Sequence, residues 1–236
     1  MWKSVWLCGL IPSVTMLAGS IASGQPQPGM LNSLTGEVWI NGVPVGQIGA
    51  GRTALGIGHT IKTGEGMAEL LLTPGSFLRL GNRSDLTLEA VATSEVRVRL
   101  WNGESLLEVL DLQTPIFVEQ NGATAVVRNS GLYEFDEKRG VIAIYAGEAR
   151  ISRNNKQIIG RKGFAVRARS VREFLANPDP GSTLFSWSSL RSEQLSSESA
   201  AAAQAYPGVV GEWHGPVPGT GIHGRLLIPG YLHQAP

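Results

Sequence analysis

The sequence predicts an all-β protein: an antiparallel, short-strand β-sandwich or solenoid-like domain of imperfect repeats, followed by one C-terminal helix and an irregular tail. Two observations support this class. Glycine supplies 30 of the 236 residues, and 13 prolines accompany it, which favours a turn-rich fold over a helical bundle. Short apolar segments also alternate with turn signals from residue 35 to residue 167, as antiparallel strands do.

The N-terminus has the layout of a secretory signal peptide. Lys3 supplies a positive charge, residues 5–18 are mostly apolar, and small residues lead up to Gly24, which is the order of regions found in such signals. The sequence therefore predicts a signal peptide over residues 1–24 and a disordered start over residues 25–34. We expect the protein to be periplasmic or extracellular.

An N-terminal anchor in the inner membrane is the alternative. Residues 4–24 carry no charge, and a membrane-spanning helix needs about 20 apolar residues. Pro12 and several polar residues in this stretch favour cleavage over anchoring. No later segment of the sequence resembles a membrane span, so we expect no further one.

Short segments separated by turn signals predict the strands of a β domain over residues 35–169. The clearest case is residues 95–101, where Val96, Val98 and Leu100 point to one side and charged residues to the other. The other expected strands cover residues 37–40, 68–72, 76–80, 85–89, 106–110, 116–119, 123–128, 132–135, 141–145, 149–152 and 164–167.

Turn signals lie between these segments. They are Asn41-Gly42, Pro74-Gly75, Asn102-Gly103, Asn121-Gly122, Arg139-Gly140 and Asn154-Asn155. The Asn-Gly pairs tolerate the positive φ of a type I′ hairpin turn. A weak internal echo also aligns residues 68–78 with residues 124–134, so that Gly75 meets Gly131. A structural repeat and a chance similarity both explain it.

The pattern changes after residue 169, where a linker and a C-terminal helix are expected over residues 170–205. Residues 171–176 suit a short helix, which the prolines that follow would end. Ser182 or Thr183 can then cap a helix over residues 184–205. A narrow apolar stripe would pack the first half of this helix on the β domain and leave the second half to fray; its members are Leu184, Trp187, Leu190 and Leu195. Residues 206–236 read as a Gly/Pro-rich tail.

Charge and cysteine content narrow the function classes. Twenty Lys and Arg face 19 Asp and Glu, a net charge of +1, so the overall balance does not indicate a nucleic-acid partner or an anionic membrane surface. Cys8 is the single cysteine, which leaves no intrachain disulfide and no cysteine-based metal site.

Motifs for chemistry are missing or lack their context. No G-x-S-x-G or H-E-x-x-H sequence occurs, and the G-x-G-x-x-G match at residues 219–224 lies among prolines instead of between a strand and a helix. His214, His223 and His233 fall in the tail without a rigid element to set ligand geometry. We therefore predict no catalytic, cofactor-binding or metal-binding residue, no cofactor and no enzymatic activity.

Aromatic residues and paired carboxylates each allow two readings. Trp39, Trp101, Tyr133 and Tyr145 could stack on sugar rings, although filling a β core or a cross-strand pair is the favoured interpretation.

Glu134 and Asp136 share one face of a strand and could approach each other. With Glu137, Lys138 and Arg139 next to them, a solvated hairpin tip is the favoured interpretation.

Four stretches of the predicted β domain resemble one known family. They are residues 35–38, 58–63, 68–80 and 141–149. Together they are similar to the FecR-like periplasmic domain, named for the ferric citrate regulators, and the resemblance extends over about half of the chain. It implies an all-β domain of imperfect strand repeats outside the inner membrane. In the regulators this domain relays the state of an outer-membrane transporter to a sigma factor.

The chain departs from the regulators ahead of this domain. The regulators carry a cytoplasmic sigma-binding segment before a membrane helix, and here only the signal-like segment precedes the domain. The resemblance therefore implies a stand-alone exported member, without sigma factor binding and without the role in iron signalling.

Three functions remain open. The leading one is a non-enzymatic interaction module of the cell envelope, with a sensory role as one option, that binds an envelope protein or glycan. The second is an enzyme acting on a glycan, in which carboxylates such as Asp85, Glu89, Glu134 or Asp136 would meet at the roughly 5 to 9 Å that glycosidases use. The third is a purely structural surface protein.

Overall fold

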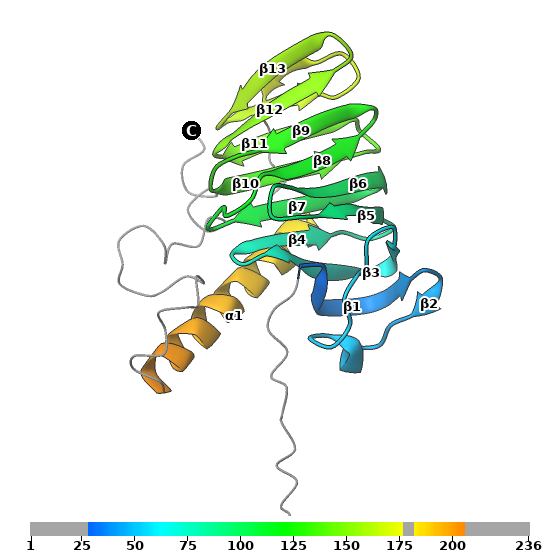
Figure 1. The fold of residues 1–236 in the computed structure, drawn as a ribbon, viewed down its shortest axis with the longest axis vertical. Coiled ribbons are helices and arrows are strands. Elements are labelled where there is room, and N and C mark those ends of the chain that lie inside the picture. Colours follow the sequence, from blue (N-terminus) through cyan, green and yellow to red (C-terminus); the bar gives the residue numbers. More distant parts are fainter. Residues whose placement is uncertain (1–27, 177–181, 206–236) are drawn as a thin grey trace, which may run out of the picture.

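The protein is mostly β structure, as the sequence predicts. The computed structural model describes residues 28–176 and 182–205 (Figure 1). The strands are β1 (Met30–Ile40), β2 (Val43–Pro44), β3 (Thr60–Thr73), β4 (Ser76–Leu80), β5 (Asp85–Val91), β6 (Val96–Asn102), β7 (Glu104–Val109), β8 (Ile116–Gln120), β9 (Ala123–Val127), β10 (Gly131–Asp136), β11 (Val141–Ala146), β12 (Glu148–Arg153), β13 (Lys156–Arg161), β14 (Phe164–Arg167) and β15 (Arg172–Leu175). A short 3-10 helix, η1 (Gln47–Gly49), precedes β3, and α1 (Thr183–Ala205) follows the strands.

The strands form one continuous sheet that folds over into two layers. Layer A consists of β13-β12-β9-β8-β6-β5, in spatial order, and layer B consists of β4-β7-β10-β11-β14-β15. The long strand β3 joins them, because its start pairs with β5 and its end pairs with β4, while β1 runs along its other edge. All neighbours are antiparallel except β6 and β8.

A glycine makes the turn from one layer to the other possible. The register between β1 and β3 shifts after Gly36, which has a φ of 65°. A Cβ atom at Gly36 would lie 2.1 Å from the carbonyl oxygen of Glu65. Only glycine fits both the positive φ and this close approach.

The core lies between the inner faces of the two layers. Val96, Val98 and Leu100 of layer A are buried against residues such as Leu78 and Leu80 of layer B. The period-2 pattern that predicted β6 from the sequence is therefore confirmed, with its charged residues on the outer face.

Two of the three Asn-Gly pairs form the turns that the sequence signals predict, whereas Asn102 of the third pair does not have a positive φ. Asn41 and Gly42 have φ values of 51° and 78°, and Asn121 and Gly122 have values of 49° and 71°. Both residues of each pair thus have the positive φ that a type I′ turn requires.

Most strands lie where the sequence predicts them. The bounds of β4 and β14 agree residue for residue. The prediction missed the two-residue β2 and also β13, which is an edge strand with mostly exposed side chains. An edge strand buries little on either face, so its sequence carries no alternation to detect.

Two expectations are corrected by the strand pairing, and one open alternative is decided by it. Residues 30–34, assigned from the sequence to a disordered start, form the first half of β1 and pair with β3. Residues 172–175 form β15 instead of a short helix, and they follow Val171, whose φ is 50°. The two echoing segments are not equivalent, because β3 and β4 form a hairpin whereas β9 and β10 lie in different layers.

Helix α1 begins and ends as expected but presents a different face. The hydroxyl of Ser182 accepts a hydrogen bond of 3.4 Å from the backbone N–H of Phe185, which caps the helix. Leu190, expected in the apolar stripe, is 58% exposed, whereas Ser188 and Ser192 are buried. The helix continues to Ala205, and its far end lies clear of the sheet in Figure 1.

Several expectations concern residues outside the described ranges. They are the signal peptide with Cys8, the Gly/Pro-rich tail, the glycine motif at residues 219–224 and the three tail histidines. Among the described residues, no helix is long and apolar enough to cross a bilayer.

Candidate functional site

The outer face of layer B holds a buried ion network under helix α1. Arg79 on β4 is fully buried between Glu69 on β3 and Glu108 on β7. Its Nε lies 2.6 Å from Glu69 Oε2, and its Nη1 lies 2.8 Å from Glu108 Oε2. Three neighbouring strands therefore place one cation between two anions, so the buried charges compensate one another in large part.

Helix α1 attaches to this network through polar side chains. Arg191 Nη2 lies 2.9 Å from Glu69 Oε1, and the hydroxyl of Ser192 donates a hydrogen bond of 2.5 Å to Glu108. Burial alone would raise the pKa of Glu69, but Arg79 and Arg191 outweigh it and leave this pKa below its usual value. The network thus positions the helix and holds Glu69 ionised.

An apolar contact completes the seat of α1. Leu184 and Phe185 are buried against Tyr145 and its neighbours on the outer face of layer B. The rings of Tyr145 and Phe185 meet edge to face, with centroids 5.3 Å apart and an interplanar angle of 72°.

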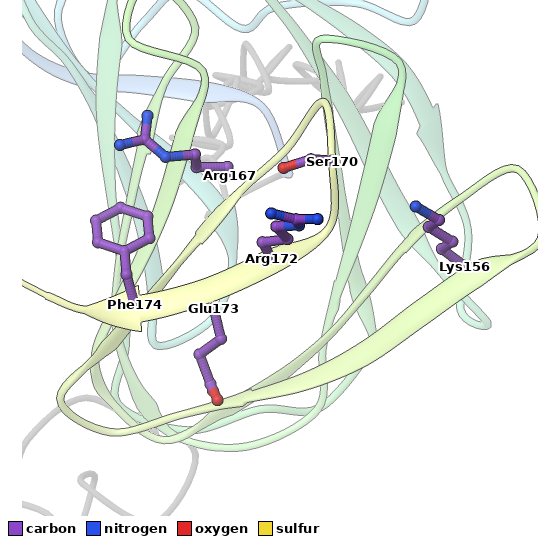
Figure 2. A pocket seen from close by; sticks show the side chains of 6 residues that line it. All are labelled: Lys156, Arg167, Ser170, Arg172, Glu173 and Phe174. Atoms are coloured by element: carbon purple, nitrogen blue, oxygen red, sulfur yellow. The ribbon is translucent and has the colours of Figure 1, made fainter.

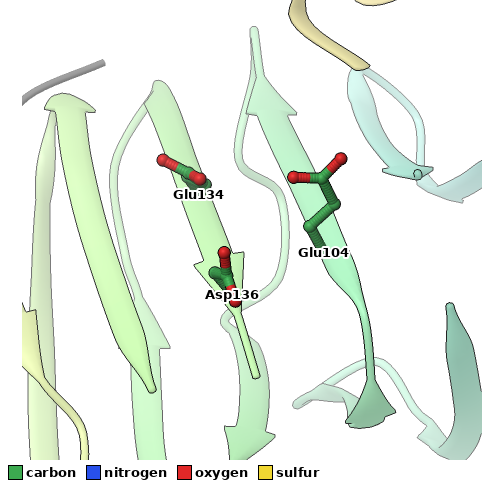
Figure 3. Close-up of side chains that lie close together, drawn as sticks. All are labelled: Glu104, Glu134 and Asp136. Atoms are coloured by element: carbon green, nitrogen blue, oxygen red, sulfur yellow. The ribbon is translucent and has the colours of Figure 1, made fainter. Parts of the chain in front are cut away.

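A second polar cluster lies further along the same face. Glu104 on β7 and Glu134 and Asp136 on β10 each bring one carboxylate oxygen within 4.8 Å of the others (Figure 3). Glu134 and Asp136 are only 5% and 6% exposed. They do approach each other as their spacing allows, but the favoured reading of a solvated hairpin tip is wrong.

Arg139 and Tyr145 contact two carboxylates of this cluster. Arg139 Nη2 lies 2.7 Å from Glu134 Oε1, and the same side chain pairs with Asp136. The hydroxyl of Tyr145 donates a hydrogen bond to Glu134. Burial raises the pKa of Glu134 above its usual value, and the contacts with Tyr145 and Arg139 reduce this shift without cancelling it. Carboxylates held this way act as a structural ion network.

The carboxylates of the glycan-enzyme alternative do not form one group. Asp85 and Glu89 lie on β5 in layer A, where Lys62 and Arg99 pair with them. Glu134 and Asp136 lie on β10 in layer B. Glu104 joins the second pair although nothing in the sequence marked it. The register between β7 and β10, which sets Glu104 opposite Asp136, is the missing information.

The outer face of layer A carries an ordered row of charged and aromatic side chains. Arg97 and Arg99 both pair with Glu119, at 2.9 and 2.6 Å. Arg97 also lies over Phe117, 4.5 Å from the ring centroid. All of these side chains are partly exposed. In layer B, by contrast, α1 covers the part of the outer face that β4 and β7 form.

Trp101 is the most exposed aromatic of this row. It is 54% exposed, and its Nε1 donates a hydrogen bond of 2.9 Å to the Thr87 hydroxyl. The Arg99 guanidinium lies 5.0 Å from the ring centroid. A pocket of about 190 Å³ adjoins the ring and includes Glu119 and Asn121 in its lining. Tyr133 and Tyr145 are buried, as the favoured core role requires. Trp101 is not in the core, but its contact with Thr87 on the neighbouring strand β5 is the cross-strand role that the same interpretation allowed.

Comparison with known proteins finds distant similarity to solved structures, two of which are described below. No family model matches the chain, and no curated protein matches it. Two crystal structures from Parabacteroides distasonis ATCC 8503, each described as a candidate anti-sigma factor, overlap with it in part. One has a TM-score of 0.41 and 16% identity over 51% of this chain and 60% of its own. The other has a TM-score of 0.42 and 13% identity over 56% of this chain and 64% of its own. The chain thus spans less than two thirds of either structure.

Proposed function

We propose that the protein is a non-enzymatic binding module of the bacterial cell envelope. In this proposal residues 1–24 direct export, and the outer face of layer A recognises an envelope protein or glycan. The resemblance of the sequence to FecR-like periplasmic domains supports the envelope location and a sensory role.

Trp101 is the observation that carries this proposal. Two neighbours, Thr87 and Arg99, hold its ring in place while more than half of the residue stays exposed. An aromatic ring held in one orientation gives a partner a large contact area at small entropic cost, which is why tryptophan is enriched among residues that dominate binding energy. The adjoining pocket adds the polar groups of Glu119 and Asn121.

The carboxylates support a binding module better than an enzyme. A glycosidase places one carboxyl group as acid and a second as nucleophile or base on either side of the bond that it cleaves. Here Arg139 pairs with both Glu134 and Asp136, and Tyr145 also occupies Glu134. The approach of these groups to Glu104 is the one feature that favours the glycan-enzyme alternative.

Binding to purified envelope fractions tests the proposed surface. We expect the mature chain to bind either an outer-membrane extract or peptidoglycan saturably. Trp101→Ala should weaken this binding by about tenfold or more, the loss typical of a central aromatic contact. Ile48→Ala is the matched control, because Ile48 is also an exposed apolar residue but lies on η1. Absence of saturable binding, or equal loss in both variants, would count against the proposal.

Intact mass and fractionation test the export step separately. After expression of the full-length gene in a Gram-negative host, we expect a mass that starts near Gln25 and a location in the soluble periplasmic fraction. A full-length mass in the membrane fraction would instead make residues 4–24 an anchor.

A further inference from the structure

One end of the sandwich is strongly basic although the whole chain has a net charge near zero. Residues 148–175, which include β12 to β15, contain eight Lys and Arg against two Glu. The whole chain balances at +1 only because the remaining residues are net acidic. Charge is therefore concentrated at the end of the sandwich far from β1, so net charge alone was a poor guide to possible anionic ligands.

A pocket of about 470 Å³ opens at this basic end (Figure 2). Lys156 contributes from the start of β13 in layer A, whereas the other lining residues come from the hairpin of β14 and β15 in layer B. These are Arg167, Ser170, Arg172, Glu173 and Phe174. The pocket therefore lies at the seam where the folded sheet approaches closure, between edge strands that do not hydrogen-bond to each other.

Three residues that line this pocket are cations. Within the described part of the chain, Lys156, Arg167 and Arg172 form no ion pair. Arg167 lies over the Phe174 ring, 5.1 Å from its centroid, which orients the guanidinium without cancelling its charge. In Figure 2 the Glu173 side chain points away from Arg172, as alternation along β15 requires.

We propose that this pocket binds a phosphomonoester group, carried either by a small soluble molecule or by a lipid headgroup. Three cations and Glu173 leave a lining charge of about +2, which complements the −1.5 to −2 of a phosphomonoester at neutral pH. Arginine guanidinium groups match phosphate oxygens in a bidentate manner, and the Ser170 hydroxyl adds a donor. The pocket is larger than a phosphate ion, which leaves room for the group that carries it.

Titration calorimetry with glucose 6-phosphate, and with glucose as the uncharged probe, tests the site. We expect glucose 6-phosphate to bind and glucose to give no signal. The double substitution Lys156→Gln with Arg172→Gln should reduce the affinity by at least about tenfold, since each cation contributes a charge-assisted hydrogen bond. Both residues are exposed, and circular dichroism can verify that the variant folds.

Arg150→Gln is the matched control for charge. Arg150 is exposed on β12, at the same basic end but outside the pocket lining. Its removal should change the affinity by less than about twofold at physiological ionic strength, where exposed charges are screened. Equal losses in the control and the double variant would show a diffuse basic surface and overturn the proposal.

Lysine and arginine on edge strands can also serve only to prevent sheet-to-sheet aggregation. A wild-type protein that does not bind glucose 6-phosphate, together with a double variant that forms oligomers, would assign the cations to that role and overturn the proposal. Trp101→Ala should bind glucose 6-phosphate normally, so failure of the layer A proposal and failure of this one are distinguishable.

Vesicles separate the two sources of the phosphate. Phosphatidic acid presents a phosphomonoester, whereas phosphatidylglycerol presents a phosphodiester with a single charge. If the ligand is a lipid headgroup, the protein should sediment with phosphatidic acid vesicles more than with phosphatidylglycerol vesicles, and the double variant should lose the difference. If the ligand is soluble, glucose 6-phosphate binds and neither vesicle sediments the protein. Equal sedimentation with both vesicles, without glucose 6-phosphate binding, would overturn the phosphomonoester assignment.

Discussion

The outer faces of the two layers contain the same types of side chain in opposite environments. On layer A, Arg97 and Arg99 pair with Glu119 at a partly exposed surface. On layer B, Arg79 pairs with Glu69 and Glu108 beneath α1, and each of these three side chains is at most 1% exposed. Water screens the first set and is excluded from the second, so similar ion pairs differ greatly in the free energy that depends on them.

The largest loss in free energy of unfolding is expected from Arg79→Met, which removes the cation of the buried network in layer B. The substitution leaves Glu69 and Glu108 with less compensation for their charge, and losing one partner of a buried pair typically costs about 3–5 kcal/mol. Urea unfolding measures it. The control is Arg83→Met, whose exposed pair with Glu65 should contribute at most about 1 kcal/mol. Equal losses in the two variants would contradict the contrast.

Detaching α1 is expected to have the next largest effect. Phe185→Ala removes a buried ring that packs on Tyr145, and such truncations cost about 3–5 kcal/mol in a full core. We expect about 2–3 kcal/mol at this helix–sheet boundary. Leu190→Ala on the exposed side of the same helix should stay within about 0.5 kcal/mol. Thermal unfolding of both variants provides the measurement, and an equal decrease would show that α1 packs through another face.

The pH dependence of the free energy of unfolding distinguishes two buried carboxylates of layer B, Glu134 and Glu69. The folded-state pKa of Glu134 is raised chiefly by burial, so the folded protein binds a proton more tightly there than the unfolded chain does. The contribution of Glu134 to stability is thus fully present below its unfolded pKa and is lost as the pH rises through its folded pKa.

Glu134→Gln should remove this loss. Relative to the wild type, the variant should gain in free energy of unfolding as the pH rises through that interval, measured by urea unfolding at several pH values. Glu69 has the opposite sign, because its lowered pKa gives stability that is lost as the pH falls. A difference between wild type and variant that stays constant with pH would contradict the assignment for Glu134.

The smallest effect is expected on the open face. Arg97→Gln should cost about 0.2–1 kcal/mol, the range typical of exposed ion pairs. Added salt should shrink that difference, because the charges are partly in water. The loss caused by Arg79→Met should change much less with salt. An Arg97 effect as large as that of Arg79 would show that layer A is covered in solution.

Local features of this fold could be predicted from the sequence. Short segments between turn signals located β4 and β14, and alternation located β6. Two of the three Asn-Gly pairs located type I′ turns. Ser182 marked the start of α1. Each depends on neighbours within a few residues, where steric and hydrogen-bonding preferences act directly.

The candidate sites could not be predicted in the same way. Ser188 and Ser192 read as the polar side of a helix, yet they are buried. A polar group can be buried when it has a hydrogen-bond partner, and Glu108 is such a partner for Ser192. That partner comes from a strand 84 residues away, so no local pattern reveals it.

The sequence by itself determined that the chain forms short strands, the positions of most turns between them, and the start of the helix. Only the tertiary structure decided that the sheet folds over at β3 and that Lys156 and Arg172 line the same pocket. It also decided that α1 packs on the outer face of layer B while Trp101 stays exposed on that of layer A. The reason is physical. Alternation assigns side chains to opposite faces of a strand, but the burial and charge of each face depend on long-range pairing that brings distant segments together.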